Sequence, residues 1–243
     1  MPSAYAFGDS DLARERLALV ADTFVDPTRA LLQSLPPGDR RYVVDLGCGP
    51  GHTTALLREA FPHSFVTGVD ASEAMVAEAR TRVPTAEFFI GDVTAALAIP
   101  AHVVYARLLL GHLADQRSAL TQWAAPLRAG GVLVCEEPVR YRSDDTLYRR
   151  YERAVTDVVA ARGGTLWASA ALDHDPPQMQ RVHDTVVEHC VEDARVAAMF
   201  WRNAVSWGGE DDLVDALRAR EAAPLDAPVI WEIRQVVWVK NPE

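Results

Sequence analysis

Apolar and polar residues alternate most regularly in the middle of the chain, between residues 39 and 138. Five short apolar runs have the length and composition of buried strands, and amphipathic stretches separate them. The runs are residues 42–46, 65–69, 88–90, 102–106 and 132–135. Strands that alternate with helices predict right-handed crossovers and a sheet covered by helices on both faces. The pattern therefore predicts an α/β fold with a doubly wound, mostly parallel sheet.

The two ends of the chain carry different patterns. Apolar residues at helical spacing predict a helix over residues 10–35, in which Asp26 and Pro27 are suited to begin a second short helix. Residues 229–239 are rich in β-branched and aromatic side chains, which predicts a strand. The sequence does not identify the partner of that strand.

Between these ends, residues 181–200 and 210–221 are interpreted as helices, and residues 163–180 as a loop because of their paired glycines and prolines. We expect a single domain rather than two. Its expected parts are an N-terminal helical cap (1–38), a core (39–138), a helical lid (139–208), and a C-terminal helix and strand that complete the sheet (209–243).

Charge and cysteine content narrow the class of protein. The formal net charge is −10, which is unfavourable for binding to nucleic acid or to an anionic membrane. The three cysteines are Cys48, Cys135 and Cys190, an odd number without zinc-ligand spacing. With no signal peptide or membrane span in the pattern, we expect reduced thiols, a cytoplasmic location and no metal site.

The segment that indicates chemistry follows the first predicted strand. Asp45 is followed by Gly47, Gly49 and Gly51, and a helical pattern begins at His52. Glycines allow a tight turn and let a ligand approach the main chain, and a helix N-terminus favours a carboxylate or phosphate. A dinucleotide fingerprint would require glycine at position 52, so the spacing counts against NAD or FAD.

This turn resembles motif I of the class I S-adenosylmethionine (SAM)-dependent methyltransferases. The resemblance continues through Gly68–Asp70 with Ser72 and Met75, through Gly91–Val93, and through the segments 105–112 and 127–134. It covers about residues 40–138 and implies the seven-stranded, Rossmann-like fold of that family.

The resemblance also implies which residues bind SAM. The turn would wrap the methionine end, with Cys48 contributing its backbone N–H. Asp70 would accept the ribose hydroxyls, and Asp92 would lie near the adenine amino group. The full implied set is Asp45, Gly47, Cys48, Gly49, Gly51, Asp70, Ala71, Met75, Gly91, Asp92, Val93, Ala106 and Arg107. Arg16 is a further candidate, for the SAM carboxylate.

The implied reaction is an in-line SN2 transfer of the methyl group to an oxygen, nitrogen or carbon atom. His112, six residues beyond the fourth strand, is the first candidate for a general base, and Glu136 or Glu137 after the fifth strand is the second. We expect the additions outside the core to determine specificity. Their aromatic residues are candidates for an acceptor pocket: Tyr5, Phe7, Tyr141, Tyr148, Trp167, Phe200 and Trp201.

The acidic charge and the aromatic additions favour a small-molecule acceptor, such as a specialised metabolite, over nucleic acid. Two alternatives stay open. One is a non-catalytic SAM-binding protein that acts as a regulator or partner subunit, and the less favoured one is an NAD-dependent oxidoreductase. The sequence does not determine the acceptor or the oligomeric state.

Overall fold

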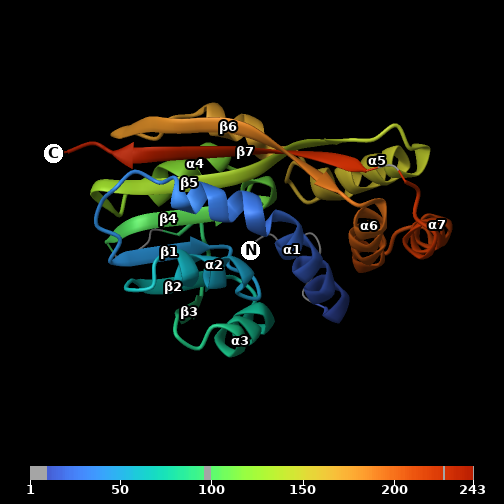
Figure 1. The fold of residues 1–243 in the computed structure, drawn as a ribbon, viewed down its shortest axis with the longest axis horizontal. Coiled ribbons are helices and arrows are strands. Elements are labelled where there is room, and N and C mark those ends of the chain that lie inside the picture. Colours follow the sequence, from blue (N-terminus) through green and yellow to red (C-terminus); the bar gives the residue numbers. More distant parts are fainter. Residues whose placement is uncertain (1–9, 96–99, 227, 243) are drawn as a thin grey trace.

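A seven-stranded sheet forms the centre of the computed structural model, which describes residues 10–95, 100–226 and 228–242. The strand order is β3-β2-β1-β4-β5-β7-β6 (Figure 1). The first five strands in this order are parallel, and β7 is antiparallel to both neighbours. The strands are β1 (Tyr42–Leu46), β2 (Phe65–Asp70), β3 (Glu87–Ile90), β4 (Ala101–Arg107), β5 (Leu127–Arg142), β6 (Met179–Val191) and β7 (Val229–Lys240). The predicted doubly wound, mostly parallel α/β fold is confirmed.

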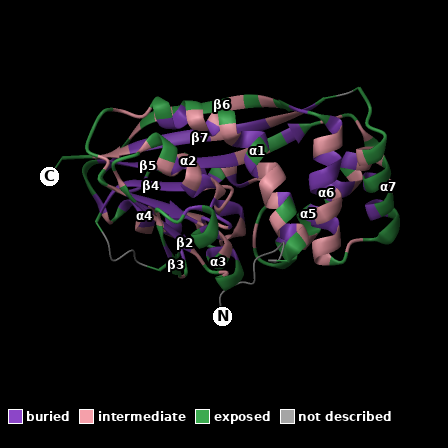
Figure 2. Ribbon diagram, turned by 60° about the horizontal axis from the view of Figure 1, so that its bottom comes forward, coloured by how far each residue is buried: buried purple, intermediate pink, exposed green. Residues whose placement is uncertain are grey.

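Helices cover both faces of this sheet. They are α1 (Asp11–Gln33), α2 (His52–Ala60), α3 (Glu73–Arg82), α4 (Gln116–Ala124), α5 (Thr146–Ala161), α6 (Asp193–Trp207) and α7 (Asp211–Ala222), with short 3-10 helices η1 (Leu110–His112) and η2 (Ala168–Asp173). Leu32 of α1 and Leu57 of α2 pack on Val43 of β1 on one face. Trp123 of α4 packs with Val44, the next residue of β1, on the other face. The alternation along β1 therefore places one hydrophobic layer on each side (Figure 2).

The register of the strands brings their carboxyl ends to one edge. Leu46 at the end of β1 lies opposite Val69 of β2 and Ala106 of β4. Asp70 at the end of β2 lies opposite Ile90 of β3. In a doubly wound sheet the ligand crevice forms outside this edge, where the strand order reverses.

The partner that the sequence left open for the last strand is now identified. β7 lies between β5 and β6 and pairs antiparallel with both. β5 and β7 extend beyond the parallel core, and α5, α6 and α7 pack on their outer ends (Figure 1). We call these three helices, with the strand ends that they cover, the extension.

Two predictions about local structure were wrong. Residues 181–200 are not one helix, because β6 runs to Val191 and α6 begins at Asp193. Exposure alternates along β6, and β7 supplies hydrogen-bond partners that helical periodicity in a single sequence does not reveal. Pro27 does not begin a second helix, since α1 continues through it. The Pro27 carbonyl accepts a hydrogen bond from Gln235 Nε2 (3.2 Å), which helps to hold α1 on the sheet.

None of the helices within the described ranges has both the length and the apolar character needed to cross a membrane.

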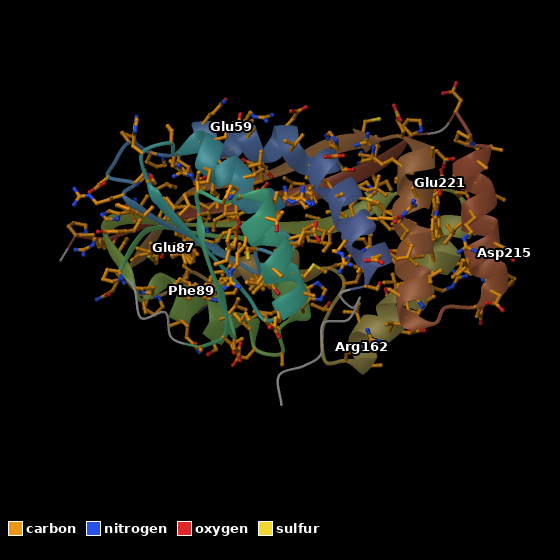
Figure 3. The ribbon with its side chains drawn as sticks, turned by 90° about the horizontal axis from the view of Figure 1, so that it is seen from below. Glu59, Glu87, Phe89, Arg162, Asp215 and Glu221 are labelled. Atoms are coloured by element: carbon orange, nitrogen blue, oxygen red, sulfur yellow. The ribbon has the colours of Figure 1, made fainter. Side chains whose placement is uncertain are left out.

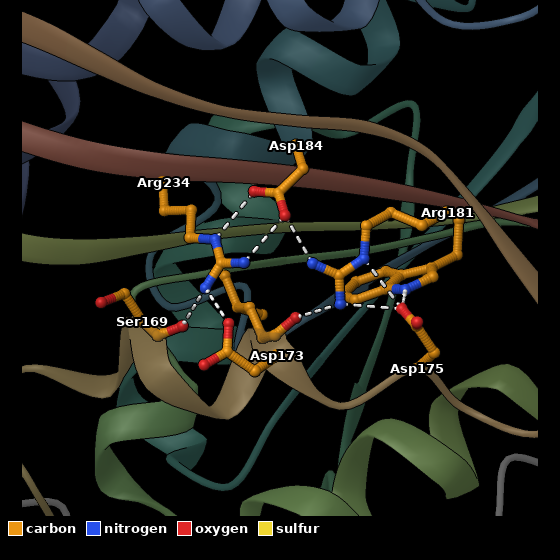
Figure 4. A network of polar contacts seen from close by, with 8 residues as sticks. Ser169, Asp173, Asp175, Arg181, Asp184 and Arg234 are labelled. Atoms are coloured by element: carbon orange, nitrogen blue, oxygen red, sulfur yellow. Dashed lines mark hydrogen bonds and ion pairs between the residues drawn. The ribbon is translucent and has the colours of Figure 1, made fainter.

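Arginines from β6 and β7 anchor the edge of the sheet (Figure 4). Arg234 donates to both oxygens of Asp184 (2.8 Å each) and to Asp173 of η2 (2.7 Å). Arg181 donates to Asp175 (2.8 Å) and to Asp184. The hydrogen bonds from Arg234, and then those from Arg181, lower the pKa of Asp184 to about 2 against the opposing effect of burial. This network ties η2 to the last two strands.

We expect Arg234→Met to lower the free energy of unfolding at pH 7 by about 1–2 kcal/mol, because charged hydrogen bonds are lost from a partly screened network. The pKa of Asp184 is depressed, so its contribution is present above the ordinary aspartate pKa and is lost as pH falls through about 2. Urea unfolding of both proteins at pH 7 and pH 3 measures this. The difference should shrink at pH 3, and the exposed Arg128→Met serves as control.

Candidate functional site

Three glycines with positive φ form the turn between β1 and α2. The φ angles of Gly47, Gly49 and Gly51 are 64°, 51° and 86°. A Cβ on Gly47 would lie 2.7 Å from Leu109 Cδ1, and a Cβ on Gly51 would lie 3.1 Å from Ala79 Cα. A Cβ on Gly49 would meet no atom of the described residues within 4 Å. The turn is thus packed against its neighbours at both ends and open in the middle, where a ligand has access to the main chain.

Asp45 fixes the helix that follows this turn. Its buried Oδ2 accepts hydrogen bonds from Thr53 Oγ1 (2.7 Å) and Thr54 Oγ1 (2.6 Å) in the first turn of α2. Burial raises the pKa of Asp45 to about 6, against the hydrogen bonds of the two threonines and the charge of Arg107. The carboxyl group of Asp45 therefore connects the end of β1 to the start of α2.

Cys48 differs from expectation, because its backbone N–H already donates to the Val69 carbonyl (3.1 Å). The N–H is engaged in joining the turn to β2 rather than pointing to a ligand. The Cys48 side chain packs with Val76 and Phe88, and burial raises the pKa of the thiol well above its usual range. Cys48 is therefore a packing residue and not a nucleophile.

Carboxylates lie at the ends of the next two strands. Asp70 Oδ2 accepts from the Gly49 N–H and Oδ1 accepts from the Ser72 N–H (2.9 Å each). Each of these oxygens has a second lone pair, so both remain able to accept a hydroxyl. Asp92 accepts from the N–H and hydroxyl of Thr94, which lower its pKa. Both acids are positioned by backbone N–H groups before any ligand binds.

Small and apolar residues surround these acids. Met75 and Val93 are buried, and Ala71 is exposed just beyond β2. The Gly91 N–H donates to the Asp70 carbonyl (2.9 Å), so the ends of β2 and β3 stay together.

The candidate bases lie beyond β4, in the case of His112, and within β5, in the case of Glu136 and Glu137, because β5 continues to Arg142 and does not end at residue 135 as the sequence predicted. Ala106 is buried and Leu108 has a φ of 54°. Glu137 Oε1 accepts from the N–H groups of Leu109 and Leu110 (2.8 Å each) and so fixes this turn. Burial raises the pKa of Glu137 to about 7, although the two N–H groups oppose that shift.

His112 follows in η1, and burial, with a smaller effect of the positive Arg16, lowers its pKa to about 4. The imidazole is therefore neutral at pH 7. Arg16 lies on the buried side of α1, and its charge also acts on Tyr151 of α5. Figure 3 shows α1 running between α3 and α6, where an ion pair between Arg14 and Glu78 (3.4 Å) ties it to α3.

The aromatic residues that the sequence offered for an acceptor pocket pack mostly on one another. Tyr151 and Phe200 stack at 3.8 Å, and Tyr141 packs against Phe200 and Trp167, so these rings form the core of the extension. Trp201 is covered by two arginine side chains. Tyr5 and Phe7 lie outside the described residues.

Several residues of the site escaped sequence reasoning. Thr53 and Thr54 lie in the first turn of α2, just after the glycine turn. Two hydroxyls at this place, beyond a strand that ends with a buried acid, could have predicted their hydrogen bonds to Asp45. Thr28 donates to Glu136 (2.8 Å) and Gln235 donates to the same carboxylate (2.7 Å). They lie far from Glu136 in the sequence, and no local pattern predicts them.

These residues fit the parts of SAM. The open middle of the turn suits the amino-acid end, the spare lone pairs of Asp70 suit a ribose diol, and the pair Met75 and Val93 suits an adenine ring. The fit rests on groups at and just beyond the ends of three adjacent strands, β1, β2 and β3.

Comparison with known proteins shows the family of the chain. A family model described as "Methyltransferase domain" matches residues 43–131. A trans-aconitate 2-methyltransferase of Paracidovorax citrulli is 32% identical over 209 residues, covering 81% of this chain and 79% of the relative. The enzyme of the same name from Azoarcus sp. is 40% identical over 122 residues. That alignment covers 50% of this chain and 48% of the relative, so the match spans only about half the relative's length.

A solved structure shares the fold. Coclaurine N-methyltransferase bound to N-methylheliamine and SAH (S-adenosylhomocysteine) superposes with a TM-score of 0.58 at 15% identity. The superposition covers 98% of this chain and 77% of that chain.

Gly49→Ala should abolish most of the affinity for SAH, because a methyl group would occupy the open middle of the turn. Gly130 has a similar positive φ (74°) with no described atom within 4 Å of its Cβ position. Gly130→Ala is therefore a matched control that carries a comparable backbone strain of roughly 1 kcal/mol. Isothermal titration calorimetry with SAH separates the two variants. Equal affinities would show that the turn does not contact the ligand.

Proposed function

The chain belongs to the class I SAM-dependent methyltransferases, and we propose that it transfers the methyl group of SAM to a carboxylate oxygen of a small organic acid. The name of the relatives, trans-aconitate 2-methyltransferase, supports an acid as acceptor. The observation that carries the proposal is the half-buried His112, whose pKa is lowered by burial and by the positive charge of Arg16.

Neither candidate base is suited to remove a proton from an alcohol. His112, with a pKa of about 4, is a weak base for a hydroxyl whose pKa is about 10 or more. Glu137 already uses Oε1 to accept two backbone N–H groups. A carboxylate acceptor, with a typical pKa of about 4, is ionised at neutral pH and needs no base.

The charge near His112 suits such an acceptor. Arg16 is 8% exposed and acts electrostatically on both His112 and Tyr151, so its guanidinium lies between the core and the extension. Guanidinium groups bind carboxylates in a bidentate geometry. Arg16, which we considered from the sequence for the SAM carboxylate, is thereby reassigned to the acceptor.

SAM, when bound, supplies a methyl group that a nucleophile takes by in-line displacement, with the bonding electron pair leaving on sulfur. The residues of this chain do the rest by binding and orientation. The turn at Gly49 and the carboxylate of Asp70 would hold the cofactor, and Arg16 would hold the acid. The neutral His112 would donate one hydrogen bond to the acceptor oxygen and would not take up a proton. The buried side of α1 excludes water from this region.

Two other interpretations remain as alternatives. A specialised metabolite methylated on oxygen, nitrogen or carbon would require an open aromatic pocket, and the described rings pack mostly on one another. A SAM-binding regulator would bind the cofactor without transferring a methyl group. Family membership argues against the NAD-dependent oxidoreductase. The cytoplasmic location stays a prediction.

Incubation with SAM and a panel of organic acids, amines and phenols tests the proposal. We expect a mass gain of about 14 Da on trans-aconitate or a related acid, and alkaline hydrolysis should reverse it because the product is an ester. Methylation of an amine or phenol in place of the acids would refute the proposed acceptor. Tight SAH binding with no product across the panel would favour the regulator.

The role of His112 separates a carboxylate acceptor from one that needs a base. We expect His112→Gln to lower kcat by less than about tenfold, and the pH dependence of the rate between pH 6 and 8 to be the same in both proteins because the histidine is neutral there. Arg16→Met should mainly raise the KM of the acid. A loss of roughly 10²–10⁴-fold in kcat for His112→Gln would restore the histidine as general base.

A further inference from the structure

Arg107 is a cation at the glycine turn with no carboxylate of its own. It is half-buried at the end of β4 and forms no ion pair within the described part of the chain. Its Nη1 donates to Thr28 Oγ1 (3.1 Å). Burial is the main influence on the pKa of Asp45 and on that of His52, and the positive charge of Arg107 lowers both values. Its guanidinium therefore lies close to the start of α2.

A buried network holds this arginine in place. Thr28 donates its hydroxyl to Glu136 Oε1 (2.8 Å), which also accepts from Tyr105 (2.5 Å). Gln235 donates to Glu136 Oε2 (2.7 Å). Glu136 is 1% exposed, and its donors come from α1, β4 and β7. Because a buried network of this kind has few alternative arrangements, the oxygen of Thr28 is fixed where Arg107 reaches it.

The geometry leaves one class of partner for Arg107. Asp45 is nearby, but within the described residues it forms no ion pair with Arg107, and its Oδ2 accepts hydrogen bonds from two threonine hydroxyls. The main chain beside Gly49 is open, and a half-buried guanidinium favours a carboxylate. The amino-acid end of SAM carries such a group.

We propose that Arg107 receives the carboxylate of the methionine part of SAM, and that Thr28 and Glu136 are positioning residues that hold Arg107 for this contact. The inference rests on the proposed function only in requiring that the cofactor binds. Glu136 is then no longer a candidate base, because both carboxylate oxygens of Glu136 already accept hydrogen bonds.

This arrangement joins cofactor binding to the docking of α1. The same Thr28 hydroxyl contacts Arg107 and Glu136, and Gln235 contacts both Glu136 and the Pro27 carbonyl. A carboxylate on Arg107 would therefore stabilise the helix that also carries Arg16.

The test compares two ligands that differ at the amino-acid end. SAH contains the carboxylate, and 5′-methylthioadenosine lacks the whole amino-acid portion. Calorimetry with both ligands isolates the contact from any effect on the nucleoside site. We expect Arg107→Met to weaken SAH binding by about 10- to 100-fold, the range for a charged hydrogen-bonded pair. Its affinity for 5′-methylthioadenosine should change by less than about twofold.

Variants of α1 test the positioning role. Thr28→Val should weaken SAH binding by about 3- to 10-fold with little effect on 5′-methylthioadenosine, and Thr28→Ser should restore it. Thr23→Val is the matched control, because Thr23 is also buried on α1 but donates only within the helix, to the Leu19 carbonyl (2.7 Å). Thermal melting verifies that each variant is folded.

Three outcomes would overturn the inference. Arg107→Met could weaken both ligands equally, it could weaken neither, or Thr28→Val could behave like Thr23→Val. If Arg16→Met lost the preference for SAH over 5′-methylthioadenosine and Arg107→Met kept it, the carboxylate of SAM would be assigned to Arg16 and not to Arg107. A wild-type protein that binds neither ligand would instead refute the proposed function.

Discussion

The buried carboxylate of Glu136 is the interaction on which the arrangement of the site depends. It accepts hydrogen bonds from Thr28 of α1, Tyr105 of β4 and Gln235 of β7, and so joins the N-terminal helix to the parallel and antiparallel parts of the sheet. An ionised group at this depth is costly unless its oxygens are satisfied, so the donors must stay together. The constraint fixes α1 across the carboxyl edge of the strands.

The acidic residues at the strand ends differ in burial, and their roles differ with it. Asp45 and Glu137 are buried and have raised pKa values, and each accepts hydrogen bonds from the segment that follows a strand. Asp92 is exposed and has a lowered pKa. Asp70 is intermediate and keeps lone pairs directed to solvent or ligand. The buried acids hold loops in place, and the more exposed ones keep hydrogen-bonding capacity that the loops do not use.

The sequence predicted those parts of the molecule that depend on neighbours in the chain. The alternation of apolar runs predicted the parallel core, and the glycine spacing after Asp45 indicated the turn. Helical spacing failed in β6, because its partner β7 lies about forty residues later and pairing across that separation leaves no local signal. The contacts of Glu136 were inaccessible for the same reason, since Thr28 and Gln235 approach it only after folding.

The extension is attached to the core through strands that the two parts share. It rests on the outer ends of β5 and β7, two strands whose inner halves belong to the central sheet. Residues such as Tyr141 and Trp231 belong to the extension, and Val134 and Val237 on the same strands belong to the core. The acceptor side and the cofactor side are therefore built on the same two strands, so a change in the pairing of β5 with β7 would be felt on both.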